Sequence, residues 1–175
     1  TIRKCFSHDE ILVRAMFLSL CHTYHGRLLG EKRAEYRRVI SRIIASTRAV
    51  PYDLSRQPDV LSILQDEQLF YARNLDPGPG IALNEALCEN VFVLLVCILT
   101  RLPVFLIGKP GSSKSLAMEL IARNLHGKTS SSPFFREFPA VEIFSFQCSP
   151  LSTPSGIEQV FSQAIKYQQH TTNSQ

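Results

Sequence analysis

Residues 104–115 read VFLIGKPGSSKS, and this stretch decides the fold. Its first four residues are apolar, as in a short strand buried on both faces. The phosphate-loop pattern is a glycine, four residues and then Gly-Lys-Ser/Thr, and Gly108, Lys114 and Ser115 fit it. Ser113 stands where the pattern has its second glycine. Because residues 116–125 have helical character, the order strand, phosphate loop, helix predicts phosphate binding in an α/β domain.

Each part of the loop has a predicted role. Successive backbone N–H groups of residues 111–115, at a helix amino terminus, form a nest for the β-phosphate of a nucleotide. Lys114 is expected to reach the β- and γ-phosphates, and the Ser115 hydroxyl is expected to bind magnesium. ATP and magnesium are therefore the predicted ligands. The predicted nucleotide-binding residues are Gly108, Gly111, Ser112, Ser113, Lys114 and Ser115. Ser113 keeps its N–H, but its Cβ must fit where the backbone approaches phosphate, which lowers the expected affinity.

Hydrolysis needs a further acidic residue, usually an Asp-Glu pair at the end of a later apolar strand. After Ser115 the chain has four glutamates and no aspartate, and no acid follows a run of four apolar residues. The four are Glu119, Glu137, Glu142 and Glu158. Glu142 lies in a strand-like run, where solvation or a local ion pair is its favoured role. The sequence therefore predicts nucleotide binding and no catalytic residue within this chain.

Composition and charge set further limits. The 175 residues are 45% hydrophobic and 19% charged, which indicates a folded chain of one domain or slightly more. The net charge is +4, with 12 basic and 9 acidic residues up to Gly80 and 7 and 6 after it. Neither part has the basic excess of a nucleic-acid-binding protein. The apolar run at 91–99 is too short to span a membrane.

The five cysteines include no Cys-x-x-Cys pair, and the first ten residues do not resemble a signal segment. Both features favour a reducing compartment, hence a cytoplasmic location. Cys21, His22 and His25 lie close together, but no second pair at zinc-ligand spacing follows. Buried or surface side chains are the favoured interpretation of these three residues.

Periodicity divides the chain into a helical part and an alternating part. Apolar residues at 11–20, 31–47 and 58–74 follow helical spacing. The segment 76–80, DPGPG, ends that periodicity and marks the predicted boundary. Beyond it, Asn84 is expected to cap a helix that ends near Thr100, residues 141–146 (VEIFSF) alternate like a second strand, and a last helix starts near Ser155. The predicted domains are residues 1–80 and 81–175.

With these motifs in view, the carboxy-terminal part resembles one AAA+ unit of the mysterin family, giant AAA+ ATPases that carry a RING-type ubiquitin ligase. The resemblance rests on GKPGSSKSLA at 108–117 and on FFREFPAVEIFSFQCSPLSTPSGI at 134–157. HGRLLGEKRAEYRRVI at 25–40 resembles the lid of the preceding AAA+ unit. The resemblance implies the lid of one unit and its linker in residues 1–80. It implies the first half of the next P-loop domain, truncated before the Asp-Glu strand, in residues 81–175.

The resemblance also implies a role for the parent protein. ATP binding or turnover is expected to change how adjacent AAA+ units pack and so to regulate ubiquitin ligation, with ubiquitin and a ubiquitin-conjugating enzyme as partners. The expected location is the cytosol and the surface of lipid droplets. Zinc belongs to the RING module of the family and has no ligands here.

Two alternatives remain open. One is an AAA+ scaffold unit that does not hydrolyse ATP, which Ser113 supports. The other is a small P-loop phosphotransferase, disfavoured because only Arg123 and Arg136 follow the loop.

Overall fold

The structure is a computed structural model that describes residues 8–46 and 60–172. It forms two compact units, Thr1–Asn124 and Leu125–Gln175. The predicted boundary at residues 76–80 lies inside the first unit, where α3 and α4 pack together across it. The division into two AAA+ units at residue 80 stays a prediction.

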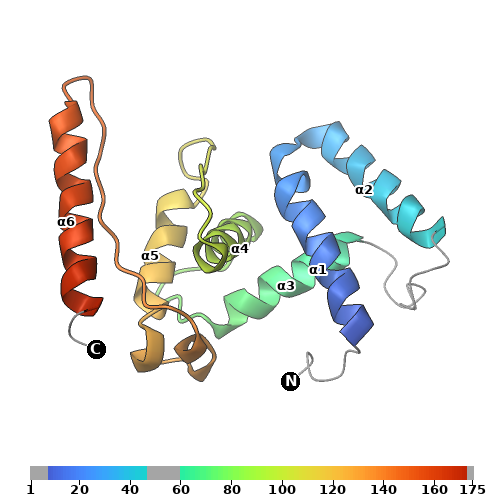
Figure 1. The fold of residues 1–175 in the computed structure, drawn as a ribbon. Coiled ribbons are helices and arrows are strands. Elements are labelled where there is room, and N and C mark those ends of the chain that lie inside the picture. Colours follow the sequence, from blue (N-terminus) through green and yellow to red (C-terminus); the bar gives the residue numbers. More distant parts are fainter. Residues whose placement is uncertain (1–7, 47–59, 173–175) are drawn as a thin grey trace. The chain divides into compact units, whose positions relative to one another are not determined.

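The described part of the first unit is helical, and its helices lie close to where periodicity predicts them (Figure 1). The long helix predicted from residue 58 is described from Val60, and Pro58 lies outside the described residues. The elements are α1 (His8–Thr23), the 3-10 turn η2 (His25–Arg27), α2 (Gly30–Ser46), α3 (Val60–Asn74), α4 (Glu85–Thr100) and α5 (Lys114–Asn124).

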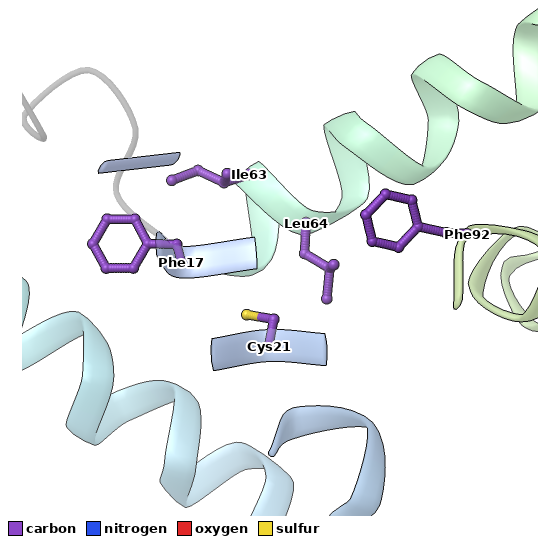
Figure 2. Packing of buried hydrophobic residues seen from close by; sticks show 5 residues of the cluster. All are labelled: Phe17, Cys21, Ile63, Leu64 and Phe92. Carbon is purple, nitrogen blue, oxygen red and sulfur yellow. The ribbon is translucent and has the colours of Figure 1, made fainter. Parts of the chain in front are cut away.

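Three helices share a buried apolar cluster (Figure 2). Phe17 and Cys21 come from α1, Ile63 and Leu64 from α3, and Phe92 from α4. Burying a side chain of the size of Phe or Ile contributes about 1.5–3 kcal/mol to the free energy of unfolding. This cluster therefore holds the early helices against α4, the helix that precedes the phosphate loop.

Within the described residues, ion pairs connect α1 with α3 and α2 with α4. Arg14 of α1 donates to Glu67 of α3 at 3.3 Å, and both side chains are buried. Arg33 of α2 donates to Glu89 of α4, also at 3.3 Å, in a more exposed place. The Arg33 guanidinium further donates to the carbonyl of Leu28 at 2.9 Å. Ion pairs thus add to the apolar contacts that hold α1 against α3, and they also join α2 to α4.

Both ends of α4 have hydrogen-bonded caps. The Asn84 side chain accepts a hydrogen bond from the Leu87 N–H at 2.9 Å, which confirms the predicted N-cap. At the other end, Arg101 has a φ of 56°, and its N–H donates to the carbonyls of Cys97 and Ile98. This left-handed residue ends the helix before Pro103, in the position where glycine is usual.

One buried amide joins the end of α5 to the segment after α3. Asn124 is 1% exposed. Its Oδ1 accepts from the N–H of Asp76 at 2.8 Å, and its Nδ2 donates to the carbonyl of the same residue at 3.1 Å. The two residues are 48 positions apart, so this pair closes α4, the phosphate loop and α5 into one loop of chain.

The second unit contains two short 3-10 turns and a long helix. The turns are η4 (Gly127–Thr129) and η5 (Pro133–Glu137). Phe134, Phe135 and Phe138 pack ring against ring, with centroids 4.9–5.3 Å apart. The last helix, α6 (Pro154–Thr172), confirms the prediction of a helix starting near Ser155.

Neither predicted strand forms in the described residues. Residues 104–107 and 141–146 have no regular secondary structure, and Phe105 and Ile107 are exposed by 90% and 95%. The single β-bridge in the described part joins His126 and Ala140. A strand needs a neighbouring strand for its backbone hydrogen bonds, and neither segment has one within the described chain. The prediction of an α/β fold is therefore not confirmed, and the described structure is helical.

A helix that crosses a bilayer needs about 20 mostly apolar residues. Among the described residues, no helix combines the necessary length with sufficient apolar character.

Candidate phosphate-binding site

The predicted site lies between the exposed segment 101–107 and α5, which begins at Lys114 (Figure 1). The loop and α5 belong to the first compact unit. The first hydrogen bond of α5 given by the structure runs from the Ala117 N–H to the Ser113 carbonyl at 3.0 Å. The N–H groups of the preceding helical residues therefore belong to the first turn, where helices have no internal acceptors. Such a turn favours a bound anion.

The signs of φ alternate along the loop, as they do in an anion nest, although the Ser112 N–H already donates to the Lys109 carbonyl at 3.3 Å. Gly111 and Ser113 have φ values of 78° and 58°, whereas Ser112 and Lys114 are not in the positive-φ region. Alternation of left- and right-handed residues turns successive N–H groups toward one concave side. Ser113, which stands where the motif has glycine, thus adopts a conformation that favours glycine.

The Lys114 ammonium is bound to the loop itself. Its Nζ donates to the carbonyls of Gly108 at 2.9 Å and Lys109 at 2.8 Å, and to the Ser112 Oγ at 2.9 Å. Three acceptors match the three donor hydrogens of a lysine. A phosphate that approaches Lys114 has to replace at least one of these bonds, so part of the gain from the new contact is offset.

Ser112 organises the interior of the loop. Its hydroxyl donates to the Lys109 carbonyl at 2.8 Å while accepting from Lys114. A Cβ added at Gly108 would lie 2.8 Å from this hydroxyl oxygen. A side chain at position 108 would therefore force the Ser112 hydroxyl to move. The Ser112 carbonyl accepts a hydrogen bond of 2.7 Å from Nδ2 of Asn90 in α4.

Ser115 is exposed at the start of α5, in a suitable place for a hydroxyl that binds a cation next to bound phosphate. The structure gives no group of three or more His, Cys, Asp or Glu side chains that could hold a metal, among the residues it describes. Glu142, the acid singled out in the sequence, is exposed and belongs to the second unit.

The basic residues near the loop and after it have separate surroundings. The Lys109 side chain is exposed on the loop. Arg136 donates to the Ser130 carbonyl at 3.1 Å and so stabilises the local turn in which it lies. The guanidinium of Arg123 lies against Gly78, in the segment that Asn124 fastens.

Cys21, His22 and His25 point to different neighbours. Cys21 is in the apolar cluster, His25 is buried near the Tyr36 ring, and His22 Nε2 lies 3.7 Å from the Cys97 sulfur. Burial, and then the nearby charge of Arg27, lower the pKa of His22. Burial raises the pKa of Cys97. These groups belong to the helix packing.

One residue of the site was missed by sequence reasoning. Asn90 contacts the loop from 22 positions away, and no motif predicts such a contact. The available signal was a short amide residue inside a helix that is otherwise largely apolar, since asparagine is a poor helix former. An asparagine in such a helix has to find a hydrogen-bond partner.

Comparison with known proteins shows which family the chain is related to. Residues 80–175 match the family described as the RNF213 AAA domain. The chain is 38% identical over 169 residues to the human E3 ubiquitin-protein ligase RNF213 and 40% identical over 165 residues to the mouse protein. It is 34% identical over 163 residues to E3 ubiquitin-protein ligase rnf213-beta of Danio rerio.

These alignments cover 93–97% of this chain and 3% of each relative. The chain therefore spans a small part of the length of the ligases that it matches. The matched residues include the strings that carry the mysterin resemblance, which the comparisons confirm. The chain belongs to the RNF213 AAA domain family.

Proposed function

We propose that this chain is the ATP-binding part of an AAA+ unit, with magnesium carried on the bound phosphates. The observation that supports this most is the alternation of φ from Gly111 to Lys114 at the start of α5. It is reinforced by the position of Lys114, whose ammonium lies within the same loop. Gly108 gives Ser112 room, and Ser115 is accessible for the magnesium ion.

At the level of the parent protein, ATP would regulate ubiquitin ligation. The support is that the relatives matched over nearly the whole chain are named E3 ubiquitin-protein ligases. In this proposal, nucleotide binding alters how this unit packs against adjacent AAA+ units of the same polypeptide. Ubiquitin and a ubiquitin-conjugating enzyme act elsewhere in the parent, where a RING module would bind zinc. The proposed location is the cytosol and lipid droplets.

The test is a calorimetric titration of the full-length protein with Mg·ATP. Lys114→Ala removes the cation of the loop, and Lys109→Ala removes the neighbouring exposed cation as a matched control. A hydrogen bond to a charged group contributes about 1.5–3 kcal/mol, which corresponds to a loss of affinity of more than about tenfold. We expect this loss at one site in Lys114→Ala and little change in Lys109→Ala. Identical isotherms for the wild type and Lys114→Ala would contradict the proposal.

A scaffold that binds ATP without hydrolysing it is the second candidate. It is favoured by Ser113, which stands where the motif has glycine and has a left-handed φ. The measurement that separates the two is turnover of radiolabelled ATP by the full-length protein and by Lys114→Ala. A turnover rate that does not fall in Lys114→Ala, although ATP binding at this site is lost, supports the scaffold.

A further inference from the structure

Asn90 holds the phosphate loop from outside the motif. Its Nδ2 donates to the Ser112 carbonyl at 2.7 Å, and the side chain is half-buried. Asn90 lies on α4, whose next buried residues, Val91 and Phe92, belong to the packed interior. The donor is therefore carried by a helix that is packed into the interior. We infer that Asn90 is a positioning residue that keeps the loop in its phosphate-binding conformation.

The hydrogen bond fixes the orientation of one peptide group. In a trans peptide the C=O and the following N–H point in opposite directions, and no cis peptide occurs among the described residues. A Ser112 carbonyl held by Asn90 therefore directs the Ser113 N–H away from the α4 amide. This N–H is one of the donors that the nest would offer to a phosphate.

Without that hydrogen bond, rotation of the peptide group between residues 112 and 113 would be favoured. Rotating the peptide between residues 112 and 113 by half a turn would change the φ of Ser113 from 58° to a negative value. Negative φ is the favoured region for a residue with a Cβ. The rotation would also direct the Ser113 N–H away from the bound anion. Asn90 opposes this rotation, and the need arises because residue 113 is not glycine.

Asn90 also links the loop to the helices that precede it. The adjacent residue on α4, Glu89, pairs with Arg33 of α2 at 3.3 Å. Consecutive residues of one helix thus contact α2 and the phosphate loop. A rotation of α4 that moves Glu89 would also move the Asn90 amide.

The inference rests on the proposed function and makes a more specific claim. In Asn90→Leu, which keeps the shape of the side chain and removes the donor, we expect the Kd for Mg·ATP to rise about five- to tenfold. In the Ser113→Gly background the same change should raise the Kd by about twofold or less, because glycine adopts both signs of φ. A role of Asn90 in helix packing alone would not be rescued by glycine at position 113.

The matched control is Asn74 of α3, a half-buried amide whose Nδ2 donates to the Phe70 carbonyl at 2.7 Å. Asn74→Leu makes the same chemical change away from the loop and should leave the Kd unchanged. The site is identified in the full-length protein as the one lost in Lys114→Ala.

The outcomes distinguish a failure of the proposed function from a failure of the proposed role of Asn90. Absence of Mg·ATP binding at this site in the wild type overturns the proposed function. Binding that is unaffected by Asn90→Leu, or weakened equally with Ser113 and with Gly at position 113, overturns the role of Asn90 and leaves the proposed function standing.

Discussion

Substitution of Ser113 tests whether loop conformation governs nucleotide binding. A left-handed φ of 58° costs a residue with a Cβ about 1–2 kcal/mol and costs glycine almost nothing. Relief of about 1 kcal/mol in Ser113→Gly favours the binding conformation and lowers the Kd for Mg·ATP by at most about fivefold. Ser113→Val should raise the Kd for Mg·ATP, since a β-branched residue is a genuine outlier at positive φ. An added cost of about 1 kcal/mol or more raises the Kd about fivefold or more.

The assay is calorimetry on the full-length protein, with the heat from this site taken as the part that Lys114→Ala removes. Arg101 provides the matched series, because its φ of 56° is nearly the same and it ends α4. Arg101→Gly and Arg101→Val should change the free energy of unfolding, in opposite directions, and leave the Kd unchanged. Equal Kd values for Gly, Ser and Val at position 113 would refute the reasoning. Equal effects of the two series on the Kd would refute it as well.

Three further predictions concern stability and accessibility. Asn84→Ala should lower the free energy of unfolding by about 1 kcal/mol, since it removes the N-cap of α4; denaturant titration measures this, and an unchanged midpoint would contradict the cap. Because the pKa of His22 in the folded chain is lowered from 6.5, the unfolded chain binds more protons, so stability should fall as pH drops below about 6.5 and level off below the folded pKa. In His22→Gln this part of the pH dependence should disappear, as unfolding curves between pH 5 and 7 would show. Iodoacetamide should alkylate the exposed Cys148 well before the buried Cys97, whose pKa is raised; equal rates, followed by peptide mass spectrometry, would contradict the burial.

Helices could be predicted because their determinants are local. The spacing of apolar residues and the Asn84 cap lie within each helix, so the start and end of α4 follow from a short stretch. The predicted strands at 104–107 and 141–146 depend on neighbouring strands, and the described chain supplies none. The apolar residues of these two segments would be buried in strands only if neighbouring strands were present.

Some features of the site could likewise be predicted from local sequence, and others depend on packing between distant residues. The motif located the loop and the start of α5, because glycine and lysine spacing is a local property. It also placed Ser113 at the glycine position, and the left-handed φ there is the physical reason for that glycine. The contact from Asn90 could not be predicted, since it joins residues that only the packing of α4 brings together.

The Asn124 amide has a consequence for how this region can change. Because it binds both backbone groups of Asp76, the ends of the segment from 76 to 124 are held together, and α3 meets the segment at that junction. Loops between fixed ends tolerate changes of length at small entropic cost. Extra residues around 101–107 could therefore be accommodated without separating the ends. Changes at Asn124 would release the two ends of this segment from each other, while α4 and α5 would still be in direct contact.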